Sequence, residues 1–195
     1  MTSPLEIAAV VLAVAYLVLA IRQNPWCWAA AMVSSAIYLW LMFEAALYME
    51  SALQIFYIAM AVYGWWCWTH PTRGRAGESA VLRISTWPLH RHVFTAVGIL
   101  LLAGASGALL SRYTDAALPY LDSFTTWGAI VATYLVARKI LENWLYWFVI
   151  DSVSVYLYVS RELYLTAALF VGYLVLIIVG YRAWRRDWQL SGSPA

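Results

Sequence analysis

The sequence predicts an all-α membrane protein with seven transmembrane helices, and three observations lead to this fold class. Apolar residues make up 64% of the 195-residue chain and charged residues only 11%, which is about half the charged fraction of an ordinary soluble domain. The apolar residues gather into seven runs, most of them close to the roughly 20 residues that span a bilayer. The chain also matches itself at an offset of 116 residues. These runs fill most of the chain, so no soluble catalytic domain is expected.

Charged, polar or helix-breaking residues separate the runs. The first run closes at Arg22, just before an Asn-Pro pair, and an acidic link at 44–50 separates the second from the third. A polar stretch at 69–92 precedes the fourth, and loops near 112–119 and 138–142 bound the fifth. Trp and Tyr crowd the ends of the runs, as interfacial aromatic belts do. The predicted helices are 7–21, 26–43, 51–68, 93–110, 124–137, 143–160 and 163–184.

The basic residues are distributed unevenly between the loops. If the helices alternate in direction, ten of the twelve Lys and Arg residues lie on one side, and only Arg112 and Arg161 lie on the other. Loops rich in Lys and Arg stay in the cytoplasm. The distribution therefore places the N-terminus outside and the C-terminus in the cytoplasm, and it favours an odd number of helices.

The internal repeat divides the chain into two similar parts. At the offset of 116, ten of the 41 positions at 28–68 are identical to their partners, including Trp28 with Trp144 and Gly64 with Gly180. Shared basic ends predict that both copies point the same way, which requires an odd number of helices between equivalent ones. Two three-helix units joined by one connector helix satisfy this requirement. Parallel repeats of this kind occur in transporters, with the ligand site at the interface of the halves. The predicted domains are 1–68 (first repeat), 69–119 (polar loop and connector helix), 120–186 (second repeat) and 187–195 (cytoplasmic tail).

Polar residues present in only one copy are the candidates for a ligand site. On the sixth predicted helix, Asn143, Trp147 and Asp151 stand at i, i+4 and i+8, with Trp144 beside them, so they share one face. The first copy offers hydroxyls and an amide instead, at Ser35, Tyr38 and Gln54. Residues common to both copies, such as the Trp28/Trp144 and Gly64/Gly180 pairs, are interpreted as packing anchors.

Asp151 is the most informative of these residues. A carboxylate well inside a transmembrane helix is costly and usually marks a binding site or a pathway. Flanking aromatic rings attract positive charge, so an organic cation is the expected ligand. Two alternatives stay open for this carboxyl group, namely a pair with an arginine and a protonated form in a helix contact. Asp122 is a second candidate on the outer side, where capping of the fifth helix is an equal alternative.

No other motif indicates a reaction or a cofactor. His70, His90 and His92 lie in the polar stretch at spacings that are poor for a metal site, and Cys27 and Cys67 are interpreted as small apolar side chains. The sequence contains none of the common hydrolase, metalloprotease or phosphate-binding motifs. We therefore expect a transporter with no metal, no cofactor and no nucleic-acid partner. A sugar facilitator with parallel repeats and a membrane-bound enzyme or assembly factor are the weaker alternatives.

Two sets of motifs resemble the PnuC family of vitamin-precursor transporters. In the second half, Arg138-Lys139 and Glu142-Asn143-Trp144-x-x-Trp147 are similar to the family's RKxxENWxxW signature, and Asp122-Ser123 matches the DS pair that precedes it. In the first half, Leu47-Tyr48, Leu53-Gln54-x-x-Tyr57 and Gly64-Trp65-x-x-Trp68 resemble the family's LYxxxxLQxxYxxxxxxGWxxW pattern.

The resemblance implies a facilitator for nicotinamide riboside in the bacterial inner membrane, with thiamine as the alternative substrate. Family members have a three-plus-one-plus-three fold, tend to form homotrimers and work without ATP, because the imported nucleoside is trapped by phosphorylation. The ligand would then contact Gln54 and Tyr57, and on the sixth helix Asn143, Trp144, Trp147 and Asp151. Some members carry Asn at the position of Asp151, and an acid there favours a cationic ligand.

Overall fold

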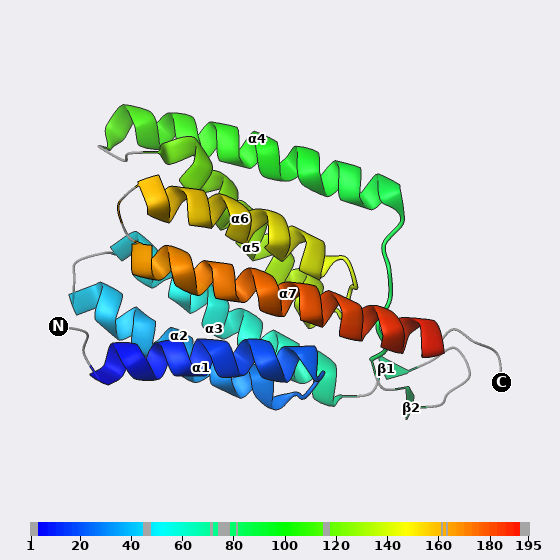
Figure 1. Ribbon diagram of the computed structural model, residues 1–195. Helices are drawn as coiled ribbons and strands as arrows, with labels where there is room; N and C mark the ends of the chain where they lie inside the picture. Colours follow the sequence, from blue (N-terminus) through cyan, green and yellow to red (C-terminus); the bar gives the residue numbers. More distant parts are fainter. Residues whose placement is uncertain are drawn as a thin grey trace. The chain divides into compact units, whose positions relative to one another are not determined.

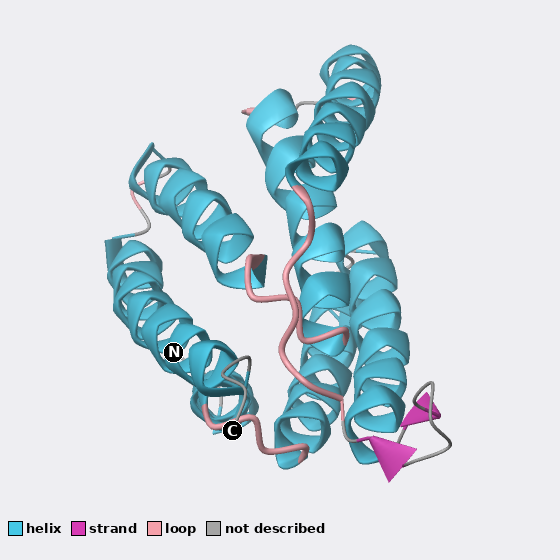
Figure 2. Cartoon of the chain, turned by 90° about the vertical axis from the view of Figure 1, so that its right-hand side faces the viewer, coloured by secondary structure: helices cyan, strands magenta, loops and turns pink. Residues whose placement is uncertain are grey.

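Seven α-helices and one short β-ribbon make up the described part of the protein in a computed structural model (Figures 1 and 2). The structure describes residues 4–44, 48–70, 72–73, 79–80, 82–114, 118–160, 162 and 164–191. The helices are α1 (Pro4–Ile21), α2 (Trp26–Glu44), α3 (Tyr48–Thr69), α4 (Leu89–Tyr113), α5 (Pro119–Ala137), α6 (Asn143–Ser160) and α7 (Tyr164–Ser191). Strands β1 (Thr72–Arg73) and β2 (Ser79–Ala80) pair antiparallel. The predicted class, an all-α protein of seven helices, is confirmed.

The helices are longer than most of the apolar runs that predict them. Helix α7 continues to Ser191, through the exposed Arg185 and Arg186, because a helix can extend beyond the apolar segment that faces lipid. The β-ribbon lies in the polar stretch, where the sequence predicts only a loop. Leu47 of the first-half motif and residues 71, 74–78 and 81 of the polar stretch lie outside the described residues.

Hydropathy along the described helices is uneven. Two segments, Leu89–Tyr113 and Thr166–Leu190, are long and apolar enough to cross a membrane by composition alone. The apolar segments Ile7–Ile21 and Trp26–Leu41 are shorter. Helix α6 falls below that standard because it carries Asn143, Asp151 and several Tyr and Trp residues. Helices α3 and α5 likewise do not reach it, so α6, which carries four of the nine predicted site residues, shares this lower hydropathy with two other helices.

The chain divides into two compact units. The first comprises Met1–Arg83 and Ala137–Lys139, and in it α2 contacts both α1 and α3. The second comprises Ile84–Val136 and Ile140–Ala195, and in it α6 packs against α7. Within the second unit the Trp127 indole N–H donates to Ser106 Oγ at 3.2 Å, which joins α5 to α4.

The internal repeat appears in the backbone of two turns, one after α1 and one after α5. Gln23 and Lys139, which are 116 residues apart, both adopt left-handed backbone angles, with φ of 53° and 51°. The amide of the next residue donates five residues back in each turn, at 2.9 Å from Asn24 to Leu19 and from Ile140 to Leu135. This is the bond of a Schellman C-cap. The two turns thus end their helices in the same way although their sequences differ.

A packing motif of two tryptophans and a glycine also occurs once in each unit. The Trp28 and Trp68 rings meet edge to face at 5.6 Å, and the Trp144 and Trp184 rings do so at 5.4 Å. Each first ring lies over a helical glycine, so that a Cβ on Gly64 would overlap Trp28 and one on Gly180 would overlap Trp144. The shared residues therefore act as packing anchors, and only glycine leaves room for the rings.

Candidate ligand-binding site

Helix α6 carries a row of buried polar side chains. Asn143 is fully buried, Asp151 is 5% exposed, and Trp144 is also buried. Trp147 is half-buried on the same face. Ser154, about one turn beyond Asp151, is buried as well. The polar face predicted from the spacing of its residues therefore extends to this serine, which was not among the predicted site residues.

Two polar atoms at the start of this row have no hydrogen-bond partner in the described part of the chain. The Asn143 side-chain nitrogen donates to the Ile140 carbonyl at 2.6 Å, which leaves its oxygen as an unused acceptor. The Trp144 indole N–H is an unused donor. A buried polar atom without a partner costs about 1–3 kcal/mol. Such atoms are therefore suited to a ligand that supplies the missing partner.

Asp151 has no basic partner in an ion pair among the described residues. The ion pairs among the described residues are His92–Glu142 and Arg186–Asp187, and neither involves Asp151. The alternative in which an arginine neutralises this carboxylate therefore finds no support in the described residues. A buried carboxylate without a counter-charge favours a cationic partner or a proton.

The DS pair lies in the first turns of α5. Asp122 is half-buried, whereas Ser123 is only 4% exposed and its hydroxyl has no hydrogen-bond partner among the described residues. Of the pair, Ser123 is thus the more deeply buried candidate. Only Asp122 was predicted as a site residue, although the motif match also covers its neighbour.

The predicted residues of the first unit are less deeply placed. Ser35 of α2 is buried at the edge of the core, and Tyr38, Gln54 and Tyr57 are half-buried. The neighbouring Ser34 donates to the Ala9 carbonyl at 2.9 Å, so its hydroxyl holds α2 to α1. Ser34 is therefore a structural residue.

The Arg-Lys pair of the signature is divided between surface and interior. Arg138 is exposed, whereas Lys139 is only 5% exposed. The Lys139 ammonium donates to the Gln23 side-chain oxygen at 3.3 Å and lies 4.6 Å from the centre of the Trp68 ring. Burial lowers the pKa of this ammonium group. Lys139 thus joins the two left-handed turns within the first unit, a position that its sequence context, a basic loop, does not predict.

Trp28 is another buried aromatic residue with a polar edge. Its indole N–H has no hydrogen-bond partner in the described residues, like that of its repeat partner Trp144. Trp68, by contrast, donates its indole N–H to the Ala137 carbonyl at 3.1 Å. Both Trp28 and Trp144 therefore combine a packing role with an unused donor.

Comparison with known proteins gives consistent results. A family model described as nicotinamide mononucleotide transporter matches residues 3–186. The riboflavin/roseoflavin transporter RibM of Streptomyces davaonensis is 30% identical over 186 residues, which cover 92% of this chain and 86% of RibM. The nicotinamide riboside transporter PnuC of Escherichia coli is 26% identical over 180 residues, 78% of this chain and 73% of that protein. The crystal structure of the vitamin B3 transporter PnuC has a TM-score of 0.72 at 20% identity and covers 94% of this chain and 81% of its own.

Proposed function

Since this chain belongs to the nicotinamide mononucleotide transporter family, the PnuC family that its motifs resemble, it is a membrane transporter of vitamins, and we propose that its substrate is nicotinamide riboside. In this proposal the nucleoside enters by facilitated diffusion and is trapped by phosphorylation in the cytoplasm. The named nicotinamide riboside transporter among its relatives supports this choice. The function requires no cofactor.

The observation that carries the proposal is the buried carboxylate of Asp151 on α6. It is 5% exposed, and no Lys or Arg of the described chain pairs with it. Nicotinamide riboside has a fixed positive charge on its pyridinium ring, which can neutralise the carboxylate in a site of low dielectric constant. Trp144 and Trp147 on the same helix face would add attraction between the cation and aromatic rings.

The unpartnered atoms near the start of α6 support a nucleoside-like ligand. Among the described residues, the Asn143 oxygen is an unused acceptor and the Trp144 indole N–H is an unused donor. A ligand with hydroxyls and a carboxamide has both kinds of group and can satisfy both atoms. We include Gln54, Tyr57, Ser35, Tyr38 and Asp122 as further contacts, on the strength of the family motifs and of the comparison between the two copies.

Riboflavin is the second candidate substrate, because RibM is 30% identical across most of both chains. Riboflavin is uncharged, so it does not use the charge of Asp151. Thiamine is a cation like nicotinamide riboside, and the carboxylate alone does not distinguish the two. An assay of substrate choice must therefore include all three vitamins.

We also propose that the protein lies in the bacterial inner membrane with its N-terminus outside and its C-terminus in the cytoplasm. The distribution of basic residues supports this orientation. The basic residues Arg182, Arg185 and Arg186 at the end of α7 are exposed and would face the anionic cytoplasmic surface. A homotrimer is the proposed assembly, by analogy with the family.

Uptake into proteoliposomes tests the function. Purified protein is reconstituted into liposomes with no ATP and no ion gradient, and labelled nicotinamide riboside, thiamine and riboflavin are added in parallel. We expect nicotinamide riboside to equilibrate across the membrane, and to accumulate further only when a nicotinamide riboside kinase and ATP are enclosed. Accumulation above equilibrium without the kinase would exclude facilitated diffusion. Entry of riboflavin or thiamine alone would exclude the proposed substrate.

A further inference from the structure

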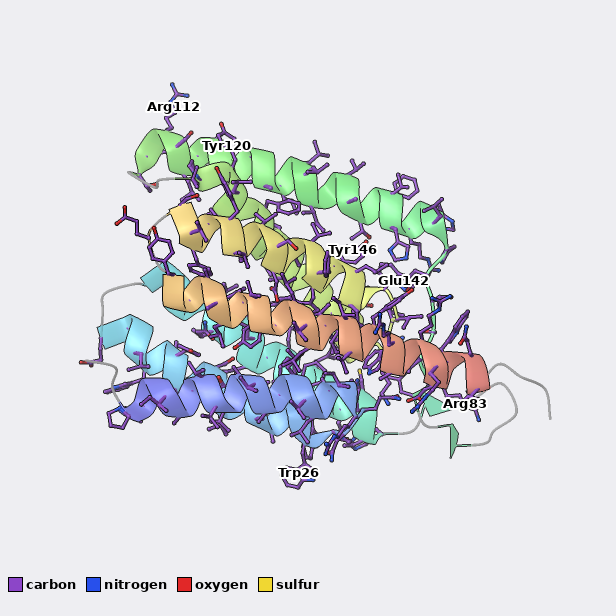
Figure 3. All side chains as sticks on the ribbon, viewed as in Figure 1. Trp26, Arg83, Arg112, Tyr120, Glu142 and Tyr146 are labelled. Atoms are coloured by element: carbon purple, nitrogen blue, oxygen red, sulfur yellow. The ribbon has the colours of Figure 1, made fainter. Side chains whose placement is uncertain are left out.

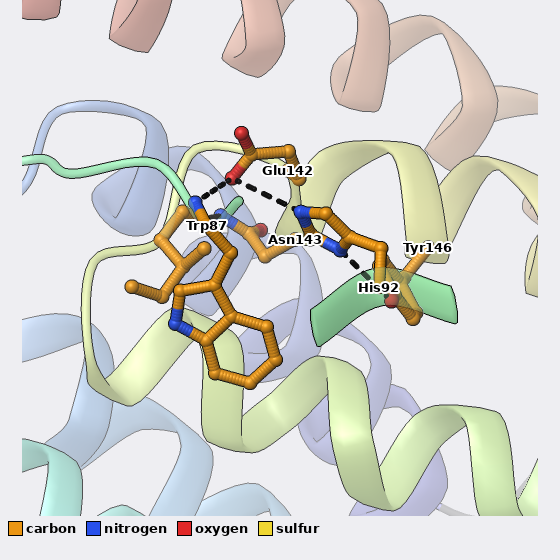
Figure 4. Close-up of polar contacts among 6 residues, drawn as sticks. Trp87, His92, Glu142, Asn143 and Tyr146 are labelled. Carbon is orange, nitrogen blue, oxygen red and sulfur yellow. Dashed lines mark hydrogen bonds and ion pairs between the residues drawn. The ribbon is translucent and has the colours of Figure 1, made fainter. Parts of the chain in front are cut away.

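A polar cluster holds the start of α4 against the start of α6, on a face that the ligand proposal does not use. It consists of Trp87, His92, Glu142 and Tyr146, all within the second unit (Figure 4). The Trp87 backbone N–H donates to Glu142 Oε2 at 3.3 Å, and His92 Nε2 lies 3.9 Å from the same oxygen. His92 Nδ1 and the Tyr146 hydroxyl are hydrogen-bonded at 3.1 Å. One carboxylate oxygen thus accepts a hydrogen bond from a backbone amide of the connector and faces His92 Nε2, a buried nitrogen without a hydrogen-bond partner among the described residues.

The chain just before α4 is attached to the same turn through its backbone. The Leu141 N–H donates to the Ser85 carbonyl at 2.8 Å, and Ser85 and Ile140 form a parallel β-bridge. Residues 84–88, which we call the strap, therefore run along residues 140–142 of the family signature. The strap and the polar cluster fix the connector to α6 at consecutive points, although the two segments are more than 50 residues apart in sequence.

Further along, the apolar packing between α4 and α6 is incomplete. An apolar groove of about 290 Å³, partly open to the surface, lies between these helices and α5, and Tyr146 is part of its lining. Its lining includes Ala96, Ile99 and Leu100 of α4 and Leu145, Val149 and Ile150 of α6. Where this groove opens, the helices make fewer of the close contacts that fix one helix on another. The polar cluster is therefore one of the contacts that determine how α6 meets α4 at this end.

The cluster and the candidate ligand face are adjacent strips of one helix. Glu142, the residue just before α6, and Tyr146 are spaced i, i+4 and lie together where the helix begins (Figure 3). Asn143 and Trp147 each follow one of them by one residue, about 100° further round the helix. A rotation of the first turns of α6 would therefore move the ligand face and break the cluster at the same time.

We propose that Glu142 and His92 are positioning residues, which set the rotation of α6 and so aim Asn143, Trp147 and Asp151 at the substrate. This inference rests on the proposed function, because it assumes that the ligand binds to that face of α6. Neither residue contacts the substrate. In a neutral imidazole, a proton on Nε2 faces the carboxylate and leaves Nδ1 to accept from the Tyr146 hydroxyl. The three side chains therefore orient one another.

The cluster is partly shielded from solvent, since the His92 and Glu142 side chains are 19% and 21% exposed. Glu142→Gln keeps an oxygen that can accept from the Trp87 N–H but removes the charge that faces His92. Tyr146→Phe removes only the hydroxyl. Both changes preserve side-chain volume, so the protein is expected to fold. The third substitution, His92→Gln, removes the imidazole that faces Glu142.

The experiment is a double-mutant cycle of Glu142→Gln and His92→Gln in purified protein, first without ligand and then with nicotinamide riboside. Without ligand, each single change should lower the melting temperature by about 2–4 °C, and the double variant should be no less stable than either single variant. With ligand, each single change should raise the dissociation constant roughly 3- to 10-fold. The double variant should show no larger increase than either single variant. Glu162→Gln, a change at an exposed carboxylate beyond the far end of α6, is the matched control and should change neither quantity.

The two readouts separate failure of this inference from failure of the proposed function. Additive losses in the ligand-free cycle would show that Glu142 and His92 are not coupled, and would overturn the inference whatever the ligand is. Coupled losses of stability with an unchanged dissociation constant would show that the cluster only stabilises the fold. That result would also overturn the inference. If the wild-type protein binds none of the three vitamins, the proposed function fails, while the ligand-free cycle still decides whether the cluster is coupled.

Discussion

Replacing Gly180 with alanine should displace the Trp144 ring and weaken substrate binding. A Cβ at this position would overlap the indole, with Cζ2 only 2.7 Å away, against an ordinary contact of about 3.4–4 Å. The ring or the helix must therefore shift by roughly an ångström, and overpacking of this kind costs about 1–3 kcal/mol. If the strain falls on a ring that contacts the ligand, affinity should drop about 5- to 150-fold.

Titration calorimetry on detergent-solubilised protein measures this loss, and the chain provides its own controls. Gly172 lies on the same helix, and a Cβ there would meet nothing within 4 Å, so Gly172→Ala should bind like the wild type. Gly64→Ala repeats the overlap against Trp28, with Cδ2 at 2.5 Å, and should lower stability in the same way. A Gly180→Ala protein with lower stability but unchanged affinity would show that Trp144 only packs, and would remove it from the site.

Three further changes test other residues of the site and its surroundings. Trp147→Ala should weaken binding by about 0.5–2 kcal/mol, as loss of a ring that faces a cation does, and unchanged binding and uptake would contradict the assignment of the α6 face. Ser123→Ala should raise the stability of the ligand-free protein by about 1 kcal/mol, because it removes a buried hydroxyl without a described partner; a clear loss on thermal unfolding would contradict this. Lys139→Met should change how stability depends on pH. Burial lowers the pKa of Lys139 below the 10.5 of a free lysine, so the unfolded chain binds more protons. Wild-type stability relative to the Met variant should therefore rise as the pH increases toward that value, and a difference that falls with pH would refute the burial of the ammonium.

The helices were predictable from the sequence because each apolar run ends at charged or turn-forming residues. The strap was not, since its attachment is a backbone bridge between Ser85 and Ile140, and periodicity carries no information on such pairing. The extension of α7 to Ser191 was also missed, because hydropathy marks the lipid-facing segment rather than the end of the helix.

For the candidate site, the burial of Asn143, Trp144 and Asp151 agrees with their common helical face. Which of their atoms lack hydrogen-bond partners depends on the position of each amide and indole, and the spacing of residues in the sequence does not reveal that position.

The burial of Lys139 could not be predicted from the sequence either. Its basic neighbours place it in an exposed loop by sequence, whereas a left-handed turn directs it into the protein, where it contacts Gln23 and Trp68.

The central claim is that Asp151 selects a positively charged substrate. The most direct measurement compares nicotinamide riboside with its reduced dihydro form, which is uncharged and nearly the same shape, by calorimetry on the wild type and on Asp151→Asn. We predict that the wild type prefers the charged form by at least roughly tenfold, and that the Asn variant loses most of this preference. Equal affinity of the wild type for the two forms, or a preference that survives in Asp151→Asn, would contradict the claim.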